Sequence, residues 1–390
     1  MACYISSTDN RFYVALEQSY GTVPAMTGAN RFPAVKLTAQ QQTEKPARRD
    51  KTGGRTFVGL PAGLRRQTSF GVKTYLTSWT TPGQEPGYGP LFQAALGGAP
   101  AFFAGSTVSA APNASTVTLA GGAGLSPGRA ITIDGEMRFV EALVDAQTVL
   151  LNAPLSKTPA AGVPVGPTAS YSPAGSLRSV SIFDCWSPGG AVQRILNGAA
   201  VDKMKIRING DFHEFEFQGG ARDLIDSASF EEGQGGLMTY PMEPEVTELS
   251  YSLVPGHLGQ AWLGAAPSKF YTLTEAEVSI DNDLDFRARE FGSATPRCIS
   301  AGVRKVSVSF SLYSNDAAAT NALYQAARQS SPVGVMFQLG QQEGQMFGVY
   351  MKAVKLDVPQ FEDSERRLQW QFTNCRAEGT LDDEIFVAFG

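Results

Sequence analysis

The sequence predicts a mainly β protein with a few helices. Glycine and proline are frequent, with 41 glycines and 23 prolines among 390 residues, and they divide the chain into many short segments. Most of these segments alternate apolar and polar residues, which is the pattern of a strand with one buried face. Only two segments have the composition of helices. The length is sufficient for two or three domains.

The expected strands follow these alternating segments along the chain. The clearest one is Lys305-Val-Ser-Val-Ser-Phe-Ser-Leu312, in which every second residue is apolar. Outside one region of low charge, strands are expected at residues 4–17, 34–38, 65–77, 180–183, 204–208, 212–217, 271–280, 305–313, 334–339, 346–356 and 368–373.

Two helices are expected. Residues 317–328 are rich in alanine and leucine, and Asp316 is a candidate N-cap in front of them. An earlier helix is expected between Pro90, which suits a first helical turn, and Gly97, which suits a helix stop.

Residues 104–172 are interpreted as a small inserted all-β domain. The region holds seven charged residues, about half the charge density found elsewhere. Its expected strands are residues 115–119, 129–133, 137–144 and 148–151, separated by glycine and proline. The Pro-rich ends, residues 110–113 and 158–173, are interpreted as tethers. We therefore expect a module that hangs on a loop at the outer surface.

Blocks of sequence occur twice in the same order, which suggests an ancient tandem duplication. The strand around Phe70 aligns with the strand around Phe310, and the preferred register pairs these two phenylalanines. The later blocks are Leu-Phe-Gln-Ala-Ala at 91–95 with Leu-Tyr-Gln-Ala-Ala at 323–327, and Phe-Glu-Phe at 215–217 with Trp-Gln-Phe at 370–372. The expected domains are residues 1–103 with 173–260, the insertion 104–172, and residues 261–390.

Composition argues against several classes of function. The net charge of −5 argues against a protein that holds nucleic acid by charge. Only two histidines are present, His213 and His257, which argues against triad catalysis and histidine-rich metal sites. The low-charge stretch 87–111 is broken by glycine and proline, so no membrane span is expected. We expect no catalytic residue, no cofactor and no metal site.

The cysteines and carboxylates leave some alternatives open. Four cysteines without a C-x-x-C pair are expected to be reduced and mostly buried, although their spacing leaves a disulfide open: Cys3, Cys185, Cys298 and Cys375. A hydrolase is the enzymatic alternative, and it would use carboxylates such as Glu214, Glu216, Glu231 and Glu232. An exposed strand face explains these carboxylates more simply.

Two long charged stretches lie at matching places in the two halves of the suggested duplication, each between two expected strands. Long loops of this kind favour docking surfaces, and a merely solvated loop is the alternative reading. The first stretch contains Lys45, Arg48, Arg49, Asp50, Lys51 and Arg55. The second contains Arg287, Arg289, Glu290 and Arg297. We expect these ten residues to contribute to such a docking surface.

With these residues in view, the chain resembles a siphophage major tail tube protein. The resemblance rests on the opening Ala15-Leu-Glu-Gln-Ser-Tyr-Gly-Thr-Val-Pro24, on Val278-Ser-Ile-Asp-Asn-Asp-Leu284, on Gly302-Val-Arg-Lys-Val306, and on the closing strand with Arg366, Leu368, Trp370 and Phe372 ahead of Ala377-Glu-Gly-Thr380. It covers about 80% of the chain, all except the insertion.

The resemblance implies a structural virion protein. A tube domain of this family is a small β-sandwich or barrel-like fold flanked by a helix. Six domains close a ring around an inner β-barrel, rings stack through long loops, and DNA passes through a lumen that tends to be negative. On this resemblance, the ten charged residues named above are the candidates for contacts between stacked rings. It further implies assembly in the host cytoplasm, and as partners the tape measure protein inside the tube, the terminator and tip proteins at its ends, and double-stranded DNA in passage.

If each chain carries two tube domains, three chains supply the six domains of one ring. We therefore expect a homotrimer with pseudo-sixfold symmetry, since head-to-tail contacts build closed rings. The alternatives are a tail-tip or tail-terminator protein of the same fold, and a module that binds the host surface through the insertion.

Overall fold

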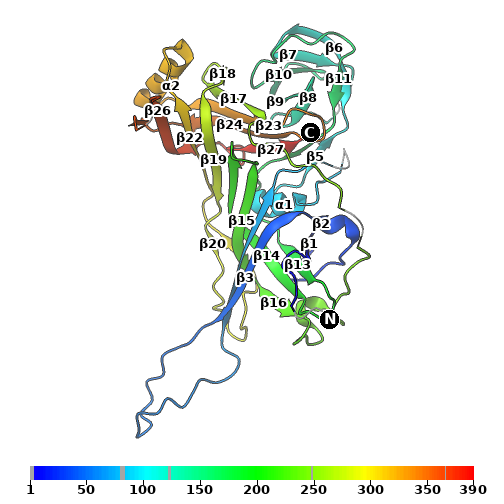
Figure 1. The fold of residues 1–390 in the computed structure, drawn as a ribbon, viewed down its shortest axis with the longest axis vertical. Coiled ribbons are helices and arrows are strands. Elements are labelled where there is room, and N and C mark those ends of the chain that lie inside the picture. The colour runs from blue at the N-terminus through cyan, green and yellow to red at the C-terminus, as the bar shows by residue number, and fades with distance from the viewer. Residues whose placement is uncertain (1–3, 80–83, 122–123, 247–248, 365) are drawn as a thin grey trace.

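The computed structural model describes residues 4–79, 84–121, 124–246, 249–364 and 366–390. The protein is mainly β, with one large antiparallel sheet system, a closed barrel of six strands and two α-helices in the described residues. The molecule is elongated (Figure 1): the barrel and α2 lie at one end, and a long loop extends from the other. The predicted fold class, mainly β with a few helices, is confirmed.

A first strand set surrounds the buried helix α1 (Gly89–Leu96). In order of hydrogen bonding its strands run β2–β1–β13–β14–β15–β4–β3, and β16 pairs with the first half of β14. Their bounds are β1 (Asn10–Leu16), β2 (Arg31–Phe32), β3 (Ala34–Thr43), β4 (Arg66–Tyr75), β13 (Val180–Trp186), β14 (Arg194–Ile208), β15 (Glu214–Ala221) and β16 (Asp223–Asp226).

A second strand set follows it in the chain, with α2 (Ala318–Gln329) in its fourth connection. Its hydrogen-bonded order is β18–β17–β23–β24–β26–β22–β19, and β27 pairs with the first half of β24. The bounds are β17 (Gly259–Gly264), β18 (Ser268–Phe270), β19 (Leu273–Asp281), β22 (Lys305–Tyr313), β23 (Val333–Leu339), β24 (Phe347–Lys355), β26 (Gln369–Ala377) and β27 (Phe386–Phe389).

The two sets have the same chain order, the same pairing and all-antiparallel ladders. The first ladder of each set, β3–β4 and β19–β22, contains a register shift at the same end, and so do β13–β14 and β23–β24. Bulges are specific local features, so equal positions strengthen the equivalence. The shifts lie between Ala34 and Lys36, Leu273 and Glu275, Val180 and Ile182, and Val333 and Val335.

One ladder joins the two sets into a continuous sheet. The second half of β14 pairs with β19, from Lys203 opposite Asp281 to Ile208 opposite Ala276. The resulting order is β3–β4–β15–β14–β19–β22–β26, which we call the joint sheet. Its long strands run along the length of the molecule (Figure 1). The short strand β25 (Gln360–Glu362) pairs with β26.

The sequence register between the sets needs a correction of two residues. Val72 lies opposite Phe217, and Phe310 lies opposite Phe372, so Val72 and Phe310 are equivalent. The predicted pairing of Phe70 with Phe310 is therefore wrong by one strand period. The face assignment is unaffected, because a shift of two residues returns each side chain to the same side of the sheet.

The residues predicted to begin and end the two helices can be compared with the structure. Helix α1 has Pro90 in its first turn and ends at Gly97, which has φ 90°, as predicted. The predicted cap Asp316 is wrong. The N-cap position is Ala317, which has no side-chain cap hydrogen bond. The Asn315 Oδ1 accepts hydrogen bonds from the Ala317 amide at 3.2 Å and from the Thr320 hydroxyl at 2.6 Å, so this side chain fixes the loop in front of the helix.

The inserted region forms a closed barrel with strand order β10–β7–β6–β11–β8–β9. The strands before and after it, β5 (Ala101–Phe103) and β12 (Thr168–Tyr171), pair with each other and so bring the two entry points together. The barrel bounds are β6 (Ser106–Asn113), β7 (Thr116–Leu119), β8 (Ala130–Ile133), β9 (Glu136–Leu143), β10 (Thr148–Leu151) and β11 (Pro164–Gly166).

The predicted tethers are wrong. Residues 110–113 belong to β6, and residues 158–173 contain both β11 and β12. Prolines are tolerated there because Pro112 and Pro164 lie near strand ends, where a ladder amide is not required.

Three smaller features complete the described fold. Strands β20 (Leu284–Asp285) and β21 (Ser300–Ala301) pair with each other, and single 3₁₀ turns occupy Gly28–Asn30 and Gln234–Gly236. Cys185 and Cys375 are buried free thiols, Cys298 is an exposed one, and Cys3 lies outside the described residues. None of the described helices is both long and apolar enough to cross a membrane.

Candidate assembly surfaces

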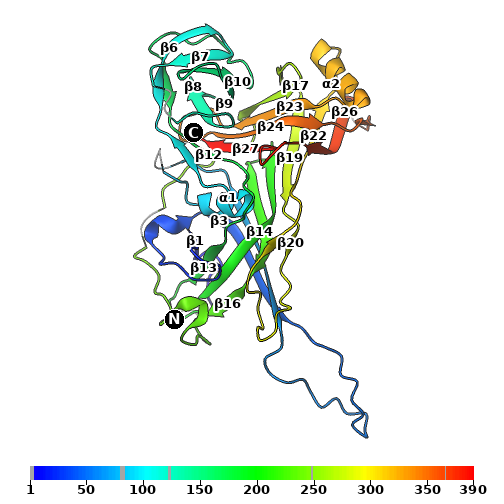
Figure 2. The ribbon, with the colours of Figure 1, turned by 180° about the vertical axis from the view of Figure 1, so that it is seen from behind.

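The first charged stretch forms a long arm between β3 and β4. The arm, residues 44–65, extends well beyond the body of the protein (Figure 2). All six predicted residues on it are exposed: Lys45, Arg48, Arg49, Asp50, Lys51 and Arg55. Arg48 forms an ion pair with Asp50 at 2.5 Å and donates to the Gly59 carbonyl at 2.6 Å, which ties the two sides of the arm together. The Arg48 hydrogen bond lowers the pKa of Asp50.

The second charged stretch forms the equivalent connection, residues 282–304, between β19 and β22. Arg287, Arg289 and Arg297 are exposed, and Glu290 is half-buried. Arg287 forms an ion pair with Asp285 at 2.5 Å, and this contact lowers the pKa of that carboxyl. Both connections point toward the same end of the molecule (Figures 1 and 2).

The two connections meet only near their bases. The Arg66 amide donates to the Ala294 carbonyl at 2.8 Å, and Arg65 donates to the Arg289 carbonyl at 3.4 Å. Within the described residues, no hydrogen bond or ion pair joins the charged side chains of the arm to those of the second connection. The ten predicted residues therefore form two separate groups at one end of the protein.

Exposed apolar side chains accompany these charges, and the sequence reasoning missed them. Phe57 is 70% exposed and Val58 is 58% exposed on the arm, and Phe291 on the second connection is fully exposed. Large apolar side chains held out in solvent are typical of surfaces that become covered by a partner. The signal was visible in the sequence as Thr-Phe-Val-Gly-Leu at 56–60, an apolar run inside a charged stretch.

One face of the joint sheet is polar and carries cross-strand ion pairs. Arg207 on β14 lies 3.4 Å from Glu216 and 3.3 Å from Glu277, on the strands to either side of it. Three further cations on this face are paired in the same way: Lys73 with Glu214 at 2.7 Å, Lys205 with Glu277 at 2.8 Å, and Lys203 with Asp281 at 3.7 Å. Partial burial of Glu277 opposes ionisation, yet Lys205 and Arg207 lower its pKa.

The same face is hollowed near the β14–β15 turn. A depression of about 700 Å³ is lined there by both polar and apolar side chains, among them Arg207, Glu214, Glu275, Phe212 and Phe310. Opposite charges on facing strands stabilise a sheet by about 0.2–1 kcal/mol per pair. Two of the four carboxylates named for the hydrolase alternative, Glu214 and Glu216, are engaged in these pairs.

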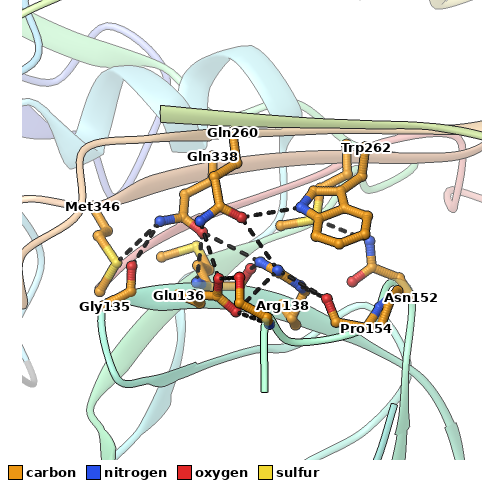
Figure 3. Close-up of polar contacts among 12 residues, drawn as sticks. Gly135, Glu136, Arg138, Asn152, Pro154, Gln260, Trp262, Gln338 and Met346 are labelled. Carbon is orange, nitrogen blue, oxygen red and sulfur yellow. Dashed lines mark hydrogen bonds and ion pairs between the residues drawn. The ribbon is translucent and has the colours of Figure 1, made fainter. Parts of the chain in front are cut away.

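The barrel is fixed to the second strand set through a buried cation, Arg138 on β9 (Figure 3). Its guanidinium donates to Glu136 at 3.2 Å, to the Pro154 carbonyl at 3.0 Å and to Gln260 of β17 at 3.3 Å. It also lies 4.8 Å from the centre of the Trp262 ring. Burial lowers the pKa of Arg138 to about 10, against the raising effect of Glu136. The side chain is fully buried, so the charge depends on these partners.

Apolar packing surrounds this polar centre. Met137 and Phe139 of the barrel form one buried cluster with Trp262, Met336 and Tyr350 of the second set. Gly348 on β24 permits the close approach, because a Cβ there would lie 2.5 Å from the Met137 sulfur. The barrel is thus packed on the sheet rather than hung from a loop, contrary to the tether interpretation.

The first strand set has a different cover on the corresponding face. There, Tyr13, Phe183 and Ile195 are packed by the chain segment that contains Phe230 and Tyr240. The barrel and this segment therefore have corresponding positions on the two sets.

Comparison with known proteins adds no family. No protein-family model matches the chain, and no curated protein sequence matches it.

Proposed function

We propose that this chain is the repeating subunit of a phage tail tube. The observation that carries the proposal is the pair of strand sets with equal topology, joined into one antiparallel sheet across β14 and β19. This arrangement is what two tandem tube-type domains with an inserted barrel would produce. The proposed division is residues 1–103 with 173–258, then 104–172 as the insertion, and 259–390. The expected boundary after residue 260 moves to residue 258, because β17 begins at Gly259 and pairs with β23 of the second set.

Ring formation follows from the way the sets are joined. One rotation relates the first strand set to the second. If the same rotation is repeated, it places the first set of another copy beside the second set of this copy, in a head-to-tail contact. Such contacts close into a ring when the rotation divides a full turn. Three copies would give six strand sets, a homotrimer with pseudo-sixfold symmetry. Closure would also pair the outer strands, whose open edges otherwise favour uncontrolled association.

Stacking of rings is assigned to the two loops at one end. The arm projects charge and the apolar pair Phe57 and Val58 beyond the body, where the next ring would lie. The ten predicted residues, in the two groups described above, are the proposed stacking contacts. The barrel packs on β17, β23 and β24, which are not part of the joint sheet, and it would therefore lie outside the tube wall.

The polar face of the joint sheet is the proposed lumen lining. Proteins hold DNA largely through cations that neutralise phosphates. On this face, Lys73, Lys203, Lys205 and Arg207 are already paired with carboxylates. Paired cations hold phosphate weakly, which would let DNA slide through. No catalytic step is assigned to the face.

Electron microscopy of the purified full-length protein tests the proposal. We expect rings or tubes with threefold symmetry and six inner lobes in averaged end-on views. A variant in which residues 46–63 are replaced by a short Gly-Ser turn is the matched control, and it should form rings without long tubes. Sixfold chain symmetry would overturn the trimer, and protein that stays monomeric at high concentration and with virion tail-tip extract would overturn the tube.

The number of copies per particle distinguishes a tube subunit from a tail-terminator or tail-tip protein of similar fold. A tube subunit occurs in many copies per particle, whereas a tip protein occurs in a few. Quantitative mass spectrometry of purified virions, normalised to the capsid protein, measures this ratio.

A further inference from the structure

We propose that β25 of one copy pairs antiparallel with β3 of the next copy, with Gln360 opposite Gln40 and Glu362 opposite Thr38. The inference builds on the proposed ring and names the strands and register that close it. The partner is a second copy of this chain, and the template is the β14–β19 ladder inside each copy.

The first step is that β25 corresponds to the second half of β14. On β14, Lys205 lies opposite Glu216, and Arg207 lies opposite Glu214 of β15. On β25, Gln360 lies opposite Gln371, and Glu362 lies opposite Gln369 of β26. Since β26 is the counterpart of β15, the strand β24 and its continuation β25 together repeat β14 without insertion or deletion.

The outer edges of these two counterparts differ. In β14 the outer edge is covered by β19, and Ile206 is fully buried. Among the described strands β25 pairs with β26 alone. Phe361, the counterpart of Ile206, packs on Tyr324 and Trp370 but is still 57% exposed. An inward-facing aromatic side chain with this exposure lacks the strand that covers its equivalent.

The opposite edge of the joint sheet shows the same difference. Strand β3 corresponds to β19, and both carry a register shift at their start. Val278 of β19 is fully buried beneath β14, whereas its counterpart Ala39 on β3 is half-buried. Strand β3 pairs with β4 alone among the described strands. Each copy therefore has one open edge of each kind.

The register of the proposed junction is obtained by replacing each residue of the β14–β19 ladder with its counterpart on β25 or β3. Arg207 opposite Glu277 becomes Glu362 opposite Thr38, and Lys205 opposite Ser279 becomes Gln360 opposite Gln40. Between them, Ile206 opposite Val278 becomes Phe361 opposite Ala39. A large ring facing a small side chain suits a close cross-strand pair.

Charge supports this register as well. Inside one copy, the cations Lys205 and Arg207 lie on β14 and the anion Glu277 lies on β19. At the proposed junction, the anion Glu362 lies on β25, and the exposed Lys36 is its diagonal neighbour on β3. Diagonal cross-strand neighbours are within reach of long side chains.

Disulfide trapping tests the junction. In a chain with Cys3 and Cys298 replaced by serine, two single variants, Gln40→Cys and Gln360→Cys, are mixed and mildly oxidised. We expect a disulfide-linked dimer in the mixture. Neither variant should form this dimer by itself, because a head-to-tail contact places residue 40 of one copy opposite residue 360 of the next. The double variant should give linked trimers. Glu362→Cys with Gln40→Cys is the register control, since a diagonal pair is about 7–8 Å apart and should stay unlinked.

The outcomes separate this inference from the tube proposal. Cross-linked pairs in protein that forms no tubes would support the junction and overturn the tube. Tubes in which the Gln40→Cys and Gln360→Cys chains stay unlinked, or link as readily in the register control, would overturn the junction alone. Absence of both tubes and cross-links would overturn both. Unchanged urea midpoints confirm that the variants, at exposed positions, are folded.

Discussion

At the scale of single residues, the most demanding position is Arg138. A fully buried guanidinium is stable only while its partners satisfy it, because desolvation of an uncompensated charge costs several kcal/mol. Here the partners come from two places, Glu136 and Pro154 in the barrel and Gln260 and Gln338 in the second strand set. The residue therefore links the orientation of the barrel to the sheet beneath it.

Replacing Arg138 with alanine should lower the free energy of unfolding by about 3–5 kcal/mol, since Glu136 would be left without its cation. The double change Arg138→Met with Glu136→Gln should recover part of that loss, because it removes both charges and retains volume. Urea unfolding, followed by tryptophan fluorescence, measures both. Equal losses in the single and double variants would contradict the charge argument.

His213 gives the protein a defined acid sensitivity. Burial lowers its pKa to about 4. The neutral ring satisfies both nitrogens, since Nε2 lies 3.2 Å from the Leu258 carbonyl and Nδ1 accepts from the Asn209 amide at 3.5 Å. The unfolded chain binds the proton near pH 6.5 and the folded chain near pH 4, so stability falls as the pH drops through this window.

We expect this histidine to make the protein about 2 kcal/mol less stable at pH 5 than at pH 7. The variant His213→Gln should lose that part of the pH dependence. Urea unfolding of both proteins at the two pH values measures the difference. An unchanged slope in the variant would assign the acid sensitivity to other groups.

At the scale of elements, helix α1 and the arm differ in burial: the helix is part of the core, whereas the arm is exposed to solvent. Helix α1 is wholly buried and is apolar except for Gln93, and Phe92 packs against Phe215 and Phe389 with ring centres 5.2 Å from each. It therefore connects the cores of the two strand sets. The arm has almost no packing of its own, so its sequence is free to serve a partner.

Changing Arg48, Arg49 and Lys51 together to alanine should shorten or abolish tubes while leaving the unfolding midpoint within error of the parent. The reason is that exposed charges contribute little to folding, whereas they lie at the proposed ring-to-ring contact. Negative-stain microscopy gives tube length, and Lys157→Ala, an exposed change on the barrel, is the control. Full-length tubes from the triple variant would remove the arm charges from the stacking contact.

At the scale of the whole molecule, the two open edges of the joint sheet are the surfaces through which we propose that copies associate. The inferred junction predicts a charge-reversal rescue. Lys36→Glu and Glu362→Lys should each weaken assembly, by about 0.5–1 kcal/mol per junction, because each creates a like-charge diagonal pair. The two changes in one chain should restore assembly.

Light scattering across a concentration series measures the threshold for assembly in these variants. Failure of the combined variant to recover, with each single variant impaired, would indicate that Lys36 and Glu362 act at separate contacts. The same series at increasing salt should narrow the differences, since exposed charges are screened.

The sequence by itself determined the local features of this protein. Alternation of apolar and polar residues identified Lys305–Tyr313 in full and the core of most long strands, because a strand with one buried face has a period of two. Pro90 and Gly97 marked helix α1 through backbone geometry. The exposed residues of both charged loops were also predictable, since dense charge is costly to bury.

Tertiary structure decided which segments became neighbours. No periodicity specifies that β14 pairs with β19, that residues 106–166 close into a barrel, or that Arg138 finds Gln260 across 122 positions of sequence. Short strands such as β11 and β25 have too few residues to show a pattern. The alternation of apolar and polar residues shows which face of a strand is buried. The identity of the neighbouring strand depends on packing between residues that are far apart in the sequence, and this packing exists only in the folded chain.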